Sequence, residues 1–191
     1  MSSPSRFTME EVGWRPRLAP VDADAATPEQ RAALDACPPA QRRTAYFLTL
    51  AHDPASLGER GALFNTVMYA PRGLPRAERE LATTVVSMAN GCVYCSSVHA
   101  RRFAELTKQP AAMQRLLDEG PGAETDPRRR AVADYAEKLT RTPGAVSAAD
   151  LAPLRAAGLD DLEILDLTHA VAMFANANRL MQSLGDSDTP A

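Results

Sequence analysis

The dipeptide Asn90-Gly91 divides the most informative stretch of the chain, residues 80–103, into two helical patterns. Asn and Gly tolerate the left-handed backbone conformation that commonly closes a helix. Before the dipeptide, apolar residues recur with the spacing of a buried helix face, at Leu81, Val85 and Met88. The sequence therefore predicts one helix that ends at this dipeptide and a second helix that begins at Cys92.

Two cysteines and a histidine share one face of the second predicted helix. At about 100° per residue, Cys95 lies about 60° around the helix axis from Cys92, and His99 falls between them. A first helical turn favours a thiolate because its free amide groups and the helix dipole present partial positive charge. Two sulfurs at this spacing can close a disulfide, and the imidazole is within reach of the second sulfur for proton exchange. The pattern indicates redox chemistry of thiols.

Other uses of a cysteine pair fit the sequence less well. Structural zinc needs four ligands, whereas Cys37, His52 and His169 are scattered singly. Covalent haem attachment requires a histidine directly after the second cysteine, where this chain has Ser96. We therefore expect neither a metal site nor a haem. Two merely structural thiols on a buried helix face remain an alternative.

At this point the chain resembles a known family, the alkylhydroperoxidase D-like or carboxymuconolactone decarboxylase-like proteins. The resemblance covers residues 27–185 and is greatest to the peroxidase-related branch. It implies the alkylhydroperoxidase D-like helical fold, with subunits that associate as dimers or as hexamers built from dimers or trimers. The residues that carry it are Glu80, Gly91-Cys92-Val93-Tyr94-Cys95 and His99, with Leu74-Pro75-Arg76 before them and His169, Phe174, Asn178 and Arg179 in a late helix.

The resemblance implies reduction of a hydroperoxide by the dithiol. Because the family assigns peroxide attack to the second motif cysteine, we expect Cys95 to attack and Cys92 to resolve. Helix-dipole reasoning alone favours Cys92 as the thiol of lower pKa, so the residues themselves leave the order open. His99 would relay a proton, and Glu80 would orient and charge-balance the imidazole. The cycle needs no metal, flavin or nicotinamide, but it needs a separate thiol or dithiol reductant.

Two further residues are candidates for lining the substrate pocket. Tyr94 stands where the best-described peroxidases of the family carry a histidine, and an unperturbed phenol pKa of about 10 makes it a poor proton shuttle at neutral pH. His169 interrupts the apolar stripe of the last predicted helix, and the resemblance places that helix next to the cysteines. Asn178 and Arg179 are expected to fix helix packing.

Composition limits the class of protein and its partners. A chain of 191 residues that is 45% hydrophobic and 24% charged is typical of one globular domain. The net charge of −3 argues against nucleic acid or an anionic membrane as a partner. The sequence has neither an apolar run of membrane-spanning length nor a hydrophobic signal core at its start. We expect a cytoplasmic protein whose three cysteines, an odd number, do not form a disulfide framework.

Prolines divide the remainder of the chain. Residues 1–26, with three prolines and the single Trp14, are predicted to form an extended arm lying across its own or a neighbouring subunit. Residues 27–185 are predicted to form one all-α domain of about eight or nine helices without a sheet, followed by a C-terminal tail, 186–191. The helices are expected near 28–37, 39–51, 54–69, 75–89, 92–106, 110–119, 127–140, 147–158 and 160–184.

Two other functions could use the same residues. A carboxymuconolactone decarboxylase-type enzyme would act on a small cyclic lactone acid without a redox-active cysteine pair. The complete set of Cys92, Cys95 and His99 argues against that activity. A redox sensor or interaction protein would oxidise the same thiols without turnover, and the sequence leaves that function open.

Overall fold

Residues 7–188, the part of the chain that the computed structural model describes, contain nine α-helices and two single-turn 3₁₀-helices. The all-α class and the helix number predicted from the sequence are confirmed. The α-helices are α1 (Pro28–Asp35), α2 (Ala45–Leu50), α3 (Pro54–Tyr69), α4 (Arg76–Ala89), α5 (Val93–Thr107), α6 (Pro110–Glu119), α7 (Pro127–Arg141), α8 (Ala148–Ala156) and α9 (Asp161–Leu184), and the 3₁₀-helices are η1 (Pro121–Ala123) and η2 (Pro143–Ala145).

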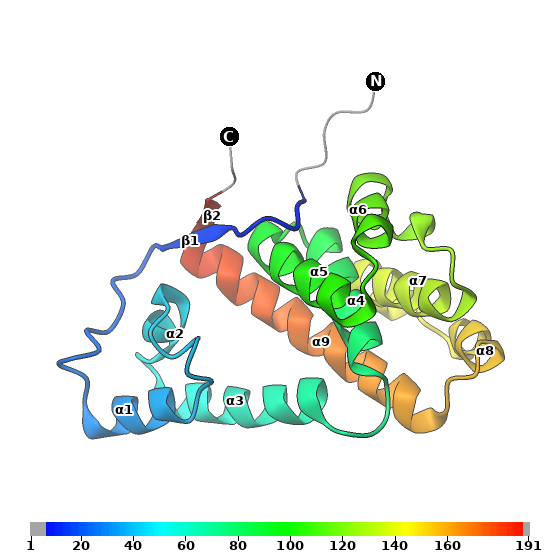
Figure 1. The fold of residues 1–191 in the computed structure, drawn as a ribbon. Coiled ribbons are helices and arrows are strands. Elements are labelled where there is room, and N and C mark those ends of the chain that lie inside the picture. The colour runs from blue at the N-terminus through cyan, green and yellow to red at the C-terminus, as the bar shows by residue number, and fades with distance from the viewer. Residues whose placement is uncertain (1–6, 189–191) are drawn as a thin grey trace.

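Helix α4 is the centre of the main core. It packs against α5, α7 and α9, and its residues from Glu78 to Ser87 are all buried. Figure 1 shows α4 and α5 side by side, with the long helix α9 crossing them. Almost every side chain in this segment of α4 therefore faces another helix. This is true of its polar side chains as well as its apolar ones. The polar ones need partners inside the protein.

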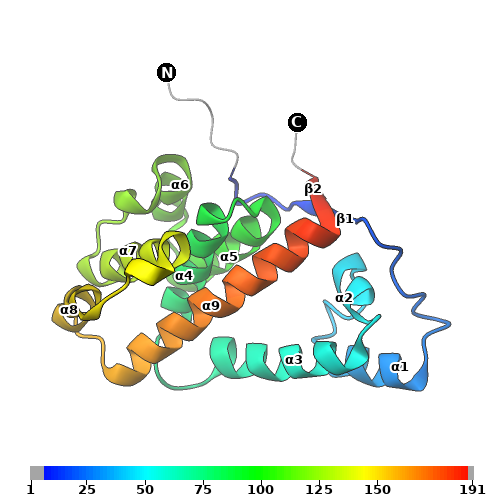
Figure 2. The same cartoon turned by 180° about the vertical axis from the view of Figure 1, so that it is seen from behind.

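Helices α1, α2 and α3 form a second group beside α9 (Figures 1 and 2). A separate apolar cluster joins this group to the beginning of α5 and the end of α9, because Tyr46, Phe47 and Leu57 pack in it together with Cys92 and Cys95. The two cysteines thus lie where the second group of helices meets the main core.

Helix α2 begins later than predicted. The sequence predicts a helix from Pro39, but residues 38–43 form turns and the helix begins at Ala45, after the N-cap Thr44. The Thr44 side chain accepts the Phe47 amide and so caps the helix at this later position. The other helices lie within about two residues of their expected ends.

The described residues also contain a two-stranded antiparallel sheet, whereas the sequence predicts none. Strand β1 (Gly13–Pro16) pairs with β2 (Gly185–Asp188), so that Pro16 lies opposite Gly185. A Cβ atom on Gly185 would come within 2.3 Å of the Trp14 ring, which explains why glycine suits this position. Each strand has only four residues and pairs with the far end of the chain. The residues near each strand therefore form no sequence pattern that would predict it.

The described part of the N-terminal arm lies across its own subunit. The Trp14 indole N–H donates a hydrogen bond to the Met181 carbonyl at 3.0 Å, and its ring meets that of Tyr46 edge-on. Arg17 donates to the carbonyls of Gln182 and Ser183 at the end of α9, where a cation complements the helix dipole. The division into arm, domain and tail stays a prediction.

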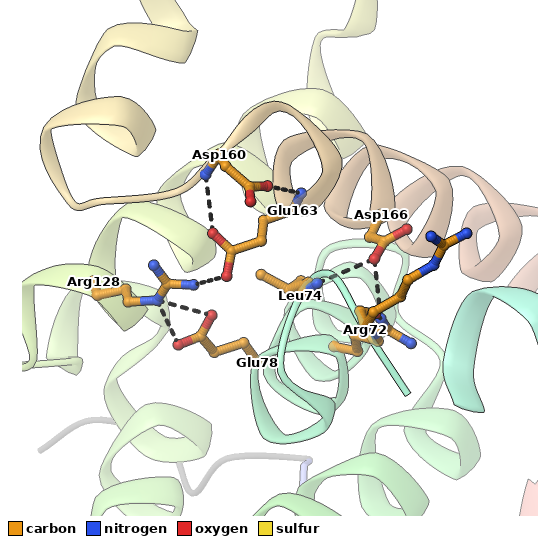
Figure 3. A network of polar contacts seen from close by, with 8 residues as sticks. Arg72, Leu74, Glu78, Arg128, Asp160, Glu163 and Asp166 are labelled. Carbon is orange, nitrogen blue, oxygen red and sulfur yellow. Dashed lines mark hydrogen bonds and ion pairs between the residues drawn. The ribbon is translucent and has the colours of Figure 1, made fainter. Parts of the chain in front are cut away.

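Asp166 of α9 fixes the loop that enters α4. Its carboxylate accepts the Leu74 amide at 3.1 Å (Figure 3). It also accepts the Arg79 guanidinium at 3.0 Å. Arg79 is 1% exposed and also donates to the Arg72 carbonyl of the same loop and to the Val67 carbonyl near the end of α3. Gly73 has φ of +76°, and a Cβ there would lie 1.9 Å from the Asp166 carboxylate. This loop needs glycine for both its conformation and its close approach to α9.

A second polar cluster joins the first turns of α4, α7 and α9. Arg128 donates to Glu78 at 2.9 Å and to Glu163 at 2.5 Å, while Glu163 and Asp160 form the capping box of α9 (Figure 3). These contacts set the axial position of α4 relative to its neighbours. Within residues 7–188, no helix has both the length and the apolar character needed to span a bilayer.

Candidate active site

The turn between α4 and α5 places the cysteine pair. Asn90 is the C-cap of α4, and Gly91 follows with φ of +77°, as the sequence predicts. The Cys92 amide then donates to the Ser87 carbonyl at 2.8 Å, which folds the turn back on α4. Cys92 is the N-cap of α5, one residue before the predicted first turn. Its sulfur therefore lies beside the free amide groups of the helix N-terminus.

The two thiols are hydrogen-bonded to each other and unequal. The Cys95 thiol and amide donate to the Cys92 sulfur, and these bonds hold the pKa of Cys92 below its usual value against the effect of burial. The same thiol bond, together with burial, raises the pKa of Cys95 well above its usual value. Both residues are reduced and buried. Of the two thiols, Cys92 is therefore the one that loses its proton more readily.

Asn178 is a third member of the cysteine site. Its side chain is fully buried on α9 and lies close enough to both sulfurs to lower the pKa of each thiol. The amide is held in place because its oxygen accepts from Asn90 at 3.0 Å and its nitrogen donates to Ser87 at 3.1 Å. Sequence reasoning assigned Asn178 to helix packing alone. The one feature of the sequence that indicates a further role is that Asn178 places a polar carboxamide on the apolar stripe of α9.

Glu80 and His99 meet in the core between α4 and α5. Oε2 of Glu80 lies 2.5 Å from Nδ1 of His99, and Oε1 accepts a hydrogen bond from Nε of Arg76 at 2.7 Å. Burial alone would raise the pKa of Glu80, but His99 and then Arg76 outweigh burial and hold that pKa below its usual value. Glu80 is therefore a carboxylate, although it is fully buried.

This contact fixes the orientation of the imidazole. Because a carboxylate only accepts hydrogen bonds, Nδ1 of His99 is the donor and Nε2 is the nitrogen left to exchange a proton. The ring edge also packs against Phe174, with centroids 4.4 Å apart at 82°. The side chain is 4% exposed, so packing and hydrogen bonding together restrict it to one position.

A cavity of about 460 Å³ opens onto these residues, and we call it the cysteine cavity. Cys95 and His99 both line it, whereas Cys92, 1% exposed, is absent from its described lining. A small molecule entering the cavity therefore meets Cys95 before Cys92. The remaining lining contains aromatic side chains, three arginines and two glutamates, and its members include Tyr46, Phe47, Phe64, Phe174, Met181, Arg60, Arg101, Arg102, Glu11 and Glu105.

Tyr94 lies in the cysteine cavity, as expected from the sequence. Burial and then the neighbouring Cys95 raise the pKa of Tyr94, so that the phenol stays protonated at neutral pH. It can donate a hydrogen bond there but does not act as a base.

His169, the other pocket candidate, is absent from the described lining of the cysteine cavity. Its side chain is exposed and lines an adjoining hollow of about 310 Å³ beside α3, which shares Arg60 and Ala177 with the cysteine cavity. The α9 residues in the cysteine cavity are Phe174, Ala177 and Met181. They share one helix face, and His169 is turned about 140° around the axis from Phe174.

Within residues 7–188, no three His, Cys, Asp or Glu side chains gather in a group that could hold a metal ion. The polar groups around the cysteines are instead bonded to one another or directed into the cysteine cavity. The residues present are those of thiol and proton-transfer chemistry.

A family model described as the carboxymuconolactone decarboxylase family matches residues 57–138, which include Glu80, both motif cysteines and His99. A search of curated proteins found no match.

Solved structures resemble the whole chain. An uncharacterized peroxidase-related protein from Ralstonia eutropha JMP134, described as an alkylhydroperoxidase AhpD core, is 26% identical, with a TM-score of 0.74 over 96% of this chain and 92% of that one. A peroxidase-related protein from Silicibacter sp. TM1040 is 26% identical, with a TM-score of 0.71 over 89% and 92%. The debrominase Bmp8, solved with 2,3,4-tribromopyrrole, is 16% identical and shares the fold, with a TM-score of 0.73 over 93% of each chain.

Proposed function

Because the chain belongs to the alkylhydroperoxidase D-like and carboxymuconolactone decarboxylase-like family, we propose that it is a thiol-dependent peroxidase that reduces organic hydroperoxides through Cys95 and Cys92. The observation that carries this proposal is the position of Cys95. It is hydrogen-bonded to Cys92 on one side and lines the cysteine cavity on the other, together with His99.

The first step is attack of the Cys95 sulfur on the terminal peroxide oxygen. The O–O bond breaks, the substrate leaves as an alkoxide, and Cys95 becomes a sulfenic acid. The alkoxide takes a proton and leaves as the alcohol. Cys92 then attacks the sulfenic sulfur, an S–S bond forms and water is released. An external dithiol reduces this disulfide by exchange and is itself oxidised, so each cycle consumes one hydroperoxide and one dithiol.

The hydrogen bond between the thiols reconciles the attack by Cys95 with its raised pKa. In the resting pair Cys92 has the lowered pKa and Cys95 the raised one. Transfer of the Cys95 proton along the bond makes Cys95 the thiolate at the moment of attack, with Cys92 as its base. Cys92 loses the same proton when it resolves the sulfenic acid. Two sulfurs that share one proton thus perform both nucleophilic steps.

His99 supplies the proton that the alkoxide needs. Nδ1 is committed to Glu80, so Nε2 delivers the proton and recovers one from solvent. The buried carboxylate orients the ring through Nδ1, and Arg76 holds that carboxylate in place. Tyr94 contributes a hydrogen-bond donor at the cavity wall.

Steady-state consumption of cumene hydroperoxide with dithiothreitol as reductant tests this proposal. We expect catalytic turnover by the wild-type protein and its loss in both Cys92→Ser and Cys95→Ser. Stoichiometric oxidation of the wild-type thiols without turnover would replace the peroxidase with a redox sensor. No oxidation of the thiols would favour a decarboxylase-type activity on a lactone acid instead.

We also propose that the protein works as a homo-oligomer in the cytoplasm. Thiols that must be reduced in each cycle suit a reducing compartment. Several large apolar side chains are exposed on the single subunit and would be covered by association, among them Leu63, Tyr69, Leu162 and Leu165. Sedimentation equilibrium tests the assembly, and a monomer at micromolar concentration would contradict it.

A further inference from the structure

Arg60 places a positive charge in the wall of the cysteine cavity. It lies on α3 and is half-buried. Three aromatic rings surround its guanidinium, with their centroids 5.6 Å away for Tyr46, 5.4 Å for Phe47 and 5.6 Å for Phe64. Rings at this distance attract a cation and restrict its movement. The guanidinium is therefore already held in position before any ligand enters.

The charge on Arg60 is not balanced by a carboxylate within the described chain. Other arginines that are buried or half-buried are paired with an acid: Arg76 with Glu80, Arg79 with Asp166 and Arg128 with Glu78. No acidic side chain of residues 7–188 lies within ion-pair distance of Arg60. Removing a cation from water without an anion costs free energy, and a bound anion would recover part of it.

The hydroxyl of Tyr46 adds a second unused donor at the same wall. Tyr46 is 7% exposed, and its hydroxyl lies beside Arg60 without a hydrogen bond of normal geometry to any described residue. Burial raises the pKa of Tyr46 to about 12, so the phenol keeps its proton and can donate. A buried donor without a partner is uncommon in a native protein. A guanidinium and a phenol together suit the two oxygens of a carboxylate.

We propose that the cysteine cavity selects hydroperoxides that carry a carboxylate, which Arg60 binds while the peroxide group lies at Cys95. This inference rests on the proposed peroxidase function and names its substrate class. The apolar body of the substrate lies against Phe47, Phe64 and Phe174. The planar guanidinium offers two parallel N–H donors, which match a carboxylate better than a single ammonium does.

Two substrates of nearly the same shape test the proposal: para-carboxycumene hydroperoxide and its methyl ester. For the wild-type protein we expect kcat/KM to be about tenfold higher for the acid. In Arg60→Met this preference disappears through loss of rate on the acid, and Arg60→Lys retains part of it. Arg115→Met, which removes an exposed arginine on α6 away from the cavity, keeps the full preference. Equal rates on acid and ester in the wild type, or a preference that survives in Arg60→Met, would overturn the proposal.

Binding of para-isopropylbenzoate, which has no peroxide group, separates this inference from the proposed function. Titration calorimetry should detect its binding to the reduced wild-type protein and about tenfold weaker binding to Arg60→Met. Such binding without any hydroperoxide turnover would overturn the peroxidase proposal and retain a carboxylate site. Turnover of the ester without any binding of the benzoate would retain the peroxidase and overturn the carboxylate site.

Discussion

Nδ1 of His99 lies 2.5 Å from Oε2 of Glu80, and this contact joins the cysteine helix α5 to the fully buried face of α4. Burying a carboxylate in the core costs free energy unless it is paired. Its pairing with an imidazole that shares a cavity with Cys95 suits proton transfer.

Glu80→Gln should lower turnover by about tenfold to a hundredfold, because the neutral amide no longer places a negative charge beside the imidazole of His99. The pH dependence of kcat should change with it, and steady-state rates across the pH range measure both effects. Glu78→Gln is the matched control, since Glu78 is also a buried, ion-paired glutamate on α4 but bonds Arg128 instead of His99. An equal loss in both variants would indicate a structural effect and contradict the proton relay.

Glu80 should also make stability depend on pH. Its pKa in the folded protein lies below the usual value of 4.5, so the folded state binds this proton less readily than the unfolded chain. The resulting stabilisation is complete above that value and is lost as the pH falls through the folded pKa. Urea unfolding between about pH 5 and pH 3 should therefore show a steeper loss for the wild type than for Glu80→Gln. Equal slopes for the two proteins would show that Glu80 is not the group responsible.

Asn178→Leu should raise the pKa of Cys92, because the amide near its sulfur, which lowers that pKa, is removed. Ultraviolet absorbance of the thiolate against pH measures this change. Asn176→Leu on the exposed side of the same helix is the control and should leave the titration unchanged. An unchanged titration in Asn178→Leu would return Asn178 to the packing role that the sequence suggested.

Gly73→Ala should destabilise the protein by about 1–3 kcal/mol, since the new Cβ would meet Asp166 and the backbone has positive φ. Gly58→Ala on α3 serves as the control, because a Cβ there has nothing within 4 Å and alanine favours a helix. Chemical denaturation compares the two variants. A Gly73→Ala protein as stable as the wild type would contradict the role of this loop.

The features that sequence reasoning predicted correctly are local ones. The end of α4 depends on Asn90 and Gly91 themselves, and the caps Asp126 and Asp160 bond amides only three residues away. Glu80 and His99 were paired through the family motif, and the structure joins them.

The features that it missed depend on contacts between distant segments. Strand β1 pairs with the other end of the chain, and Arg60 reaches the cysteine cavity only because α3 packs beside α9. The sequence spacing along α9 shows that His169 and Phe174 lie on different faces of the helix. Only the packing of that helix decides which face meets α5. Asn178, on the buried face, took the place at the cysteines that was expected of His169.

The most direct test of the central claim is the site of the first oxidation. Reduced Cys92→Ser protein would be treated with one equivalent of cumene hydroperoxide in the presence of dimedone, which labels sulfenic acid, and then mapped by peptide mass spectrometry. The same experiment on Cys95→Ser is the comparison. We predict a dimedone adduct on Cys95 in the first variant, formed more slowly than the oxidation of the wild type because serine cannot take the proton from Cys95, and little or none on Cys92 in the second. An adduct on Cys92 in Cys95→Ser, with Cys95 unlabelled in Cys92→Ser, would contradict the account and reverse the two roles.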